Sequence, residues 1–199
     1  VTFIGTVSPA GGNLKEPVTE STKKAARCFY ALEQNRADQK RYPAVNPIDS
    51  YSKYLEYPEI REYLNQTVKP GWVEMVERAK NIVRKGKEAN DQINILGDDG
   101  VPMSYHEVFW KSELVDFVIL QQDAFDAIDA LCPIERQSYM LDLVLGICDQ
   151  EFKFEDYEQC RNFFKELINL LRQMNYSEFK SEKFENYRQK LTNLLSNGN

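Results

Sequence analysis

The chain has 199 residues, 42% of them hydrophobic, which is enough for one large or two small domains with a buried core and does not indicate disorder. Its formal net charge of −6 argues against a nucleic-acid binder, because such a protein needs a basic face to neutralise phosphates. The sequence shows no signal peptide and no apolar run long enough to cross a bilayer. We therefore expect neither nucleic acid as a partner nor direct membrane insertion.

The cysteines and the single histidine do not indicate a metal site or a catalytic site. Cys28, Cys132, Cys148 and Cys160 form no C-x-x-C pair, and His106 is the one imidazole of the chain. A Cys/His zinc site is therefore not expected, and we interpret the cysteines as small apolar residues of a reduced cytosolic protein. His106 stands near the start of an expected helix, where we assign it a surface or capping role.

The first third of the chain has mixed character. Residues 1–8 are β-branched and aromatic and predict a buried strand. Because a natural N-terminus seldom begins inside an element, we expect the chain to be part of a longer protein. A helix is predicted from Pro17, since proline is favoured in a first helical turn. Residues 28–32 fit either a strand or a buried helical turn, and residues 41–57 read as irregular.

The rest of the chain reads as helices. Apolar residues recur at helical spacing, and prolines and glycines separate the stripes. The expected helices cover about 58–67, 70–96, 104–118, 133–148, 157–174, and a last one from residue 177 or 181 onward. The predicted fold class is mainly α, with a helical bundle preceded by a short strand-containing segment.

The sequence lacks a self-sufficient active site. A phosphate-binding loop needs a glycine-rich turn followed by Lys-Ser/Thr at a helix start. The one Gly-Lys pair, at residues 86–87, is followed by Glu88 inside a predicted helix. From the residues alone we therefore predict no catalytic residues and no metal site.

Three stretches carry a resemblance to a known family. Residues 6–19 contain T-V-S-P-A-G-G-N and E-P-V-T, residues 29–52 contain F-Y-A-L, Y-P-A-V-N and S-Y-S, and residues 121–133 contain Q-Q-D-A-F and C-P. In this order they resemble the catalytic A subunit of V-type and archaeal-type ATPases, and more distantly the β subunit of F-type ATP synthases. The resemblance runs to about residue 150. It implies a remnant of the nucleotide-binding domain over 1–52 and the helical C-terminal domain over 53–199.

The resemblance also implies a site. In this family ATP lies between the two domains, so Tyr42 is expected to stack on the adenine and Phe125 to close the other side of the pocket. Leu131 matches a further pocket position, and Gln121 and Gln122 are expected to offer amide groups to the base edge. Stacking of a base on an aromatic ring contributes on the order of 1 kcal/mol or more.

Partners follow from the same resemblance. Asp98 and Asp99 match the loop that touches the central rotor stalk. The implied assembly is a peripheral, cytoplasmic hexamer with the non-catalytic B subunit that couples ATP turnover to proton or sodium transport, with ATP or ADP and Mg bound in the intact protein. This chain lacks the phosphate-binding loop and is expected neither to hydrolyse ATP nor to hold nucleotide tightly.

Two alternatives remain open at this point. The chain could be a non-catalytic helical interaction module, or part of the B subunit of the same complex. The S-P-A-G-G and Q-Q-D-A-F stretches favour the A subunit over the B subunit.

Overall fold

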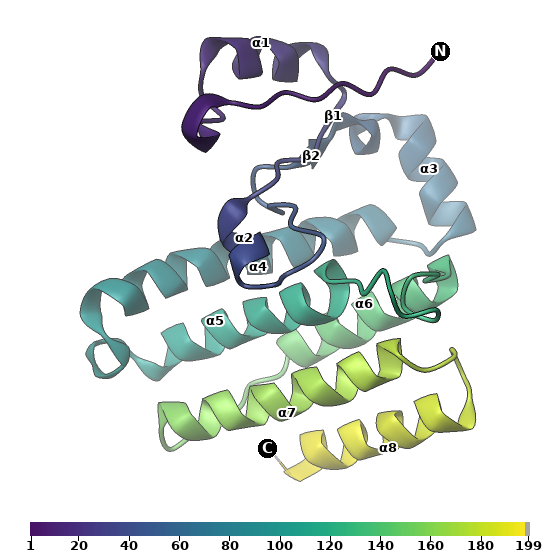
Figure 1. Cartoon of the computed structure of the whole chain (residues 1–199). Helices are drawn as coiled ribbons and strands as arrows, with labels where there is room; N and C mark the ends of the chain where they lie inside the picture. Colours follow the sequence, from purple (N-terminus) through teal and green to yellow (C-terminus); the bar gives the residue numbers. More distant parts are fainter. Residues whose placement is uncertain (198–199) are drawn as a thin grey trace.

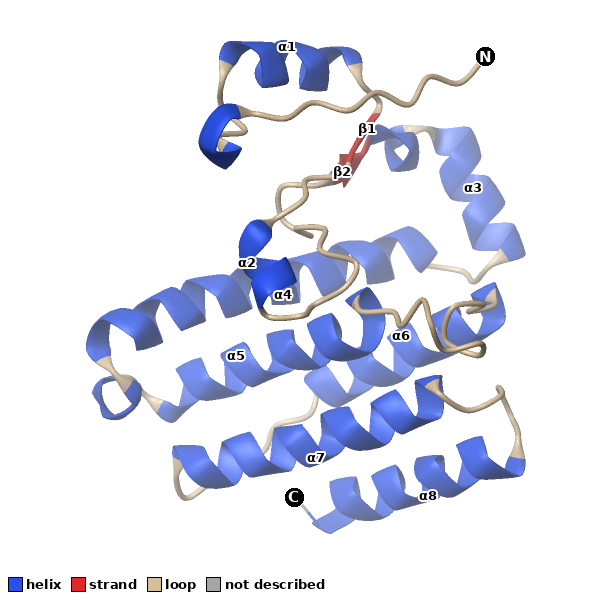
Figure 2. Ribbon diagram, viewed as in Figure 1, coloured by secondary structure: helices blue, strands red, loops and turns tan. Residues whose placement is uncertain are grey.

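The computed structural model describes residues 1–197 and is mainly helical, with loops in its first third and before α6 (Figure 2). Helices α4 (Trp72–Leu96), α5 (Met103–Val115), α7 (Tyr157–Asn175) and α8 (Glu182–Asn197) lie side by side in this order (Figure 1). Within residues 1–197 no helix is both long and apolar enough to cross a bilayer. The mainly α bundle expected from the sequence is confirmed.

The N-terminal segment differs from the prediction. Residues 1–8 form no strand, and the side chains of Phe3 and Ile4 are 91% and 92% exposed. A strand is stable only when a neighbouring strand pairs with its amides and carbonyls, and none does so here within the described residues. The first elements are instead a short 3₁₀ turn, η1 (Ala10–Gly12), and helix α1 (Pro17–Ala25).

A small antiparallel pair of strands follows. Strand β1 (Cys28–Phe29) pairs with β2 (Tyr51–Ser52), with Cys28 opposite Ser52. The short helix α2 (Gln34–Asp38) lies in the excursion between the two strands, and the turn η2 (Lys53–Glu56) comes after β2. Of the two readings left open for residues 28–32, the strand is correct.

The remaining elements match the predicted helices closely. They are α3 (Pro58–Thr67), the π-helical turn η4 (Asp116–Leu120) that extends α5, and α6 (Ile134–Cys148). The short 3₁₀ turn η3 (Asp98–Gly100) lies in the break expected between residues 96 and 104. The main core is shared by α5, α6, α7 and α8. Its fully buried members include Leu114, Val144, Phe164, Leu171 and Leu191. Each such side chain contributes roughly 1.5–3 kcal/mol through removal of apolar surface from water.

Helices α4 and α5 touch at one unusually close point. A Cβ added to Gly86 in α4 would lie 2.0 Å from the Cβ of Ser112 in α5. Non-bonded carbon atoms do not approach so closely, so only glycine permits this helix contact. The glycine of the sequence's Gly-Lys pair therefore has a packing role.

Candidate functional site

A pocket of about 450 Å³ lies where the segment before residue 44, the end of η4, the loop after it and the end of α7 meet. The lining consists of Lys40, Tyr42, Pro43, Phe117, Gln121, Gln122, Asp123, Ala124, Phe125, Asp129, Arg172, Asn175 and Tyr176. Four of the residues expected around adenine are thus gathered in one cavity: Tyr42, Gln121, Gln122 and Phe125. The pocket borders a π-helical turn, a feature often found at functional sites.

Two segments distant in sequence are joined at the pocket through their backbones. The amide of Gln122 donates a hydrogen bond to the carbonyl oxygen of Tyr42 at 3.0 Å, and the peptide bond between Tyr42 and Pro43 is cis. The amide of Gln121 donates to the carbonyl oxygen of Asp116 at 3.0 Å, so the chain leaves the π-helical turn in a defined direction. The Tyr42 ring is largely exposed at the pocket wall.

Phe125 stands at the rim of the pocket. Its side chain is 100% exposed, so it makes no contribution to the core. The carboxylate of Asp123 accepts a hydrogen bond from the Phe125 amide at 2.9 Å, which fixes the backbone of this turn. A large aromatic ring fully open to solvent beside a cavity is unusual for a chain with a well-formed core, and it gives a flat apolar face that a ligand ring can cover.

The two glutamines have different environments. The Gln122 side-chain amide donates to the carbonyl oxygen of Asp129 at 2.7 Å and is therefore used to hold the loop. The Nε2 of Gln121 is buried and has no hydrogen-bond partner among the described residues. A buried polar group without a partner costs free energy, which a ligand acceptor at this position would recover. The structure thus separates a structural glutamine from a free one.

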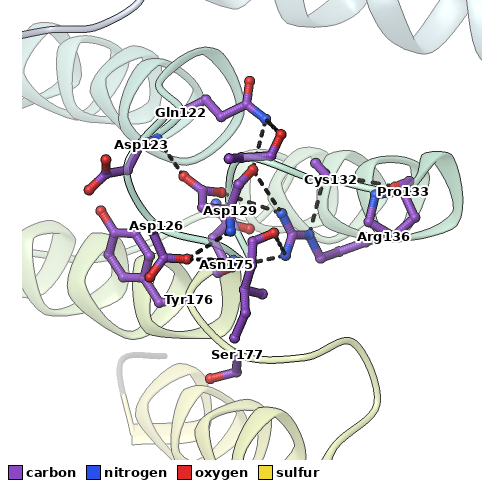
Figure 3. A network of polar contacts seen from close by, with 12 residues as sticks. Gln122, Asp123, Asp126, Asp129, Cys132, Pro133, Arg136, Asn175, Tyr176 and Ser177 are labelled. Atoms are coloured by element: carbon purple, nitrogen blue, oxygen red, sulfur yellow. Dashed lines mark hydrogen bonds and ion pairs between the residues drawn. The ribbon is translucent and has the colours of Figure 1, made fainter.

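A buried arginine holds the loop that carries Phe125 (Figure 3). Arg136 of α6 is only 1% exposed. Its Nη1 donates to the carbonyl oxygens of Asn175 at 3.0 Å and Ile128 at 3.2 Å, and its Nε donates to the Sγ of Cys132 at 3.3 Å. Since one guanidinium binds the loop and the end of α7, the two pocket walls are fixed relative to each other.

Asp129 completes this network. Its carboxylate accepts from the Asp123 amide at 2.7 Å and lies 3.4 Å from Arg136 (Figure 3). Burial raises the pKa of Asp129 above its ordinary value, while the hydrogen bond from Asp123 and the charge of Arg136 act in the opposite sense. The side chain thus holds the loop backbone at the edge of the cavity.

The structure adds pocket residues that the sequence did not indicate. Lys40 comes from the segment before Tyr42, and Arg172, Asn175 and Tyr176 come from the end of α7. The α7 residues lie beyond the stretch of resemblance, so no motif marked them. Their common signal is the helical spacing of Arg172 and Tyr176, which also pair through a 3.2 Å hydrogen bond.

Other expected site residues lie elsewhere. Leu131 is 79% exposed and is not part of the pocket lining. Asp98 and Asp99 form the exposed turn η3 at the opposite end of α5 from the pocket. The surface role assigned to His106 is wrong: its ring is buried, with Nε2 2.9 Å from the carbonyl oxygen of Asp98, so it fixes the turn from inside.

The described residues offer no ready metal centre. Among residues 1–197, no three His, Cys, Asp or Glu side chains come together in a way that would hold an ion. All four cysteines are free thiols.

Comparison with known proteins identifies the family of this chain. Residues 61–163 match the family described as the C-terminal domain of V and A type ATP synthase, and residues 1–52 match the nucleotide-binding domain of the ATP synthase alpha/beta family. The chain belongs to the V- and A-type ATP synthase family. It corresponds to the C-terminal part of the A subunit, and the family resemblance seen in the sequence is confirmed.

Individual relatives agree with the family assignment. The chain is 39% identical over 195 residues to the V-type ATP synthase alpha chain of Chlamydia abortus. The aligned residues make up 98% of this chain and 32% of the relative. The corresponding protein of Borrelia duttonii is 40% identical over 195 residues, with 98% and 32% covered. The chain thus spans about a third of the length of the curated relatives that it matches.

A solved structure shares the fold. The unique ATP synthase subunit NeqB of Nanoarcheaum equitans aligns with a TM-score of 0.53 and 19% identity, over 71% of this chain and 33% of that one. At this level of identity the likeness concerns the fold alone.

Proposed function

We propose that this chain supplies the adenine side of the nucleotide site in the catalytic subunit of a V-type rotary ATPase. The single observation that carries the proposal is the pocket, whose lining brings together Tyr42, Phe125 and Gln121. We assign residues 1–52 to the nucleotide-binding domain and residues 53–199 to the helical C-terminal domain, so that the pocket forms where the two adjoin.

The residues expected around adenine have different parts in this proposal. Tyr42 and Phe125 offer aromatic faces for stacking, which contributes about 1–3 kcal/mol per base in nucleic-acid complexes. Gln121 reads the base edge, because a glutamine amide can donate to one ring nitrogen of adenine and accept from its amino group. Gln122 shapes the loop and makes no direct contact with the base. Leu131 contributes apolar surface near the loop.

The phosphate end of the substrate is held elsewhere in the intact protein. Mg would bind the phosphates of ATP or ADP and polarise them for transfer. No cluster of suitable ligands occurs within residues 1–197, so the residues of this chain bind and orient the base but carry out no step on the phosphates. The chain alone is therefore inactive and binds nucleotide weakly.

The same assignment supplies the partners. The B subunit, in a hexamer of three A and three B subunits, closes the outer side of the nucleotide site. The exposed turn with Asp98 and Asp99 meets the central rotor stalk, so ATP turnover drives proton or sodium transport. The complex is peripheral to the membrane on its cytoplasmic side.

The decisive experiment substitutes Tyr42 in the ATPase assembled with the full-length protein. Tyr42→Ala removes the ring and raises the KM for ATP about tenfold, the size of a lost stacking contact. Tyr42→Phe keeps the ring and loses only a long 3.5 Å hydrogen bond to the carbonyl oxygen of Ala37, so its KM stays near that of the wild type. An unchanged KM for Tyr42→Ala would remove Tyr42 from the nucleotide site and overturn the proposed adenine pocket.

A further inference from the structure

Four charged side chains form a nearly buried cluster directly beside the pocket. Arg36 binds Asp116 through two hydrogen bonds, Nη1 to Oδ2 at 3.1 Å and Nη2 to Oδ1 at 2.7 Å. Arg41 binds Glu113 in the same two-pronged manner at 2.9 and 2.8 Å, and it also contacts Asp116. The side chains retain between 6% and 18% exposure.

The cluster joins the segment that carries Tyr42 to the end of α5. Arg36 lies in α2, and Arg41 is the residue immediately before Tyr42. Glu113 belongs to the last turn of α5, and Asp116 is the first residue of the π-helical turn η4. Two segments far apart in sequence are thus fixed to each other at the point where the pocket begins.

Asp116 binds both walls of the pocket at once. Its carboxylate holds the two arginines, whereas its carbonyl oxygen accepts a hydrogen bond from the Gln121 amide at 3.0 Å. The guanidinium of Arg41 also lies over the ring of Phe117, 4.7 Å from its centroid, and Phe117 lines the pocket. Displacement of Arg41 would therefore move residues of the cavity.

Stability alone does not explain this cluster. Two positive and two negative groups cancel, but buried ion pairs seldom stabilise a fold more than apolar side chains of similar size would. The two-pronged geometry instead fixes direction, because a planar guanidinium meets a carboxylate in one orientation. Burial alone would lower the pKa of Arg41, but its bonds with Glu113 and Asp116 raise it above the ordinary value, so the charge is permanent.

We propose that Arg41, held by Glu113 and Asp116, is a positioning residue that sets where the Tyr42 ring stands in the pocket. This inference rests on the proposed adenine site. Arg41 itself does not touch the base. Its guanidinium fixes the backbone one residue before the stacking ring, and Arg36 holds the other end of the same short segment through Asp116.

The test uses Arg41→Lys in the ATPase assembled with the full-length protein. Lysine keeps the charge but cannot form the fork, so the ring is placed less accurately. We expect the KM for ATP and the Kd for MgADP to rise about tenfold, while kcat changes less than about twofold. The matched control is Arg78→Lys, which alters an exposed arginine–carboxylate pair with Asp149 away from the pocket and leaves both constants unchanged.

A double variant separates positioning from general damage. If Arg41 acts through Tyr42, Tyr42→Ala combined with Arg41→Lys binds MgADP no more weakly than Tyr42→Ala alone. If the two substitutions instead raise the Kd for MgADP by independent factors that multiply in the double variant, the positioning role is wrong. If Arg41→Lys fails to assemble, Glu113→Gln is the second variant. It removes the two-pronged contact of Arg41 with Glu113 and leaves the Arg36–Asp116 pair intact. We expect the same rise in the KM for ATP and the Kd for MgADP.

The outcomes also distinguish this inference from the function on which it rests. If Tyr42→Ala weakens MgADP binding but neither Arg41→Lys nor Glu113→Gln does, the positioning role is wrong and the adenine site stands. If Tyr42→Ala has no effect on binding, the adenine site itself is wrong, and the positioning role with it.

Discussion

The amide of Gln122 and the carbonyl oxygen of Tyr42 are joined by a 3.0 Å hydrogen bond, which ties the two walls of the pocket through backbone atoms alone. Substitution of either side chain leaves this bond in place. Mutations at Tyr42, Gln121 or Phe125 therefore report what each side chain does for a ligand, with little contribution from collapse of the pocket.

Phe125→Ala separates binding from stability. Because the ring is fully exposed, its removal creates no cavity and leaves the thermal midpoint of unfolding within about 1–2 °C of the wild type. In the assembled ATPase, the KM for ATP rises about tenfold through the lost ring face. Phe125→Trp offers a larger face and serves as the control that keeps binding. A large loss of thermal stability in Phe125→Ala would show that the ring packs against the protein.

Gln121→Leu changes base selectivity. Adenine and guanine carry different donors and acceptors on their edges, and in the proposed site the amide of Gln121 is assigned to the adenine edge. We expect the ratio of kcat/KM for ATP over GTP to fall about tenfold, the value of one or two lost hydrogen bonds. In Gln122→Leu the loop loses its hydrogen bond to the carbonyl oxygen of Asp129. We expect kcat/KM to fall equally for ATP and GTP, so that their ratio is unchanged. Equal ratios in the two variants would contradict the assignment.

Gly86→Ala destabilises the bundle. The new methyl group would stand 2.0 Å from the Cβ of Ser112, and such overpacking costs about 1–3 kcal/mol. The matched control is Gly146→Ala in α6, where an added Cβ meets no described atom within 4 Å; there alanine stabilises the helix by up to about 1 kcal/mol. Urea unfolding of both variants measures the difference. If Gly86→Ala is neutral, the two helices separate more readily than the structure shows.

Alkaline pH weakens the fold through two thiols. Burial raises the pKa of Cys148 and Cys160 to about 12. The unfolded chain loses these protons near pH 8.5 while the folded chain keeps them, so stability is complete below about pH 8.5 and declines as pH rises toward 12. Replacement of both residues by alanine should flatten this decline in urea midpoints. Cys132→Ala, at an exposed position, should leave the slope unchanged, and a flat wild-type profile would contradict the prediction.

Charge reversal at the η3 turn tests the rotor contact. Asp98→Lys with Asp99→Lys should lower the number of ions pumped per ATP while hydrolysis by the detached catalytic sector continues. The turn itself keeps its shape, because His106 contacts the carbonyl oxygen of Asp98 and not its side chain. Asp91→Lys, exposed on α4, is the control, and unchanged pumping in the double variant would remove these aspartates from the interface.

The helices were the most predictable part of the fold. Apolar spacing and the flanking prolines placed α3 and α6 within a residue or so of their bounds, since both signals are local. The strand predicted over residues 1–8 was wrong. A strand needs a second strand to pair with, and the local sequence does not show whether that second strand is present. His106 was misplaced for a similar reason, as its burial arises from Tyr157, a ring on another helix 5.5 Å away.

The candidate site was partly predictable. Family motifs indicated Tyr42, Gln121, Gln122 and Phe125, and the structure brings all four to one pocket. The distinction between the two glutamines was not available, because it depends on where the carbonyl of Asp129 lies. The arginine network and the α7 wall were also missed, since both join segments whose proximity arises only from the fold.

The contact between Gly86 and Ser112 has a mechanical consequence. Helices separated by layers of long side chains can slip past one another, because those side chains switch rotamers as they move. Where the short side chain of Ser112 packs directly against the backbone of Gly86, that freedom is lost, so α4 and α5 resist shear along their axes. If α4 and α5 tilt at the pocket end, they would rotate together as one rigid unit, and the η3 turn at their other end would move with them.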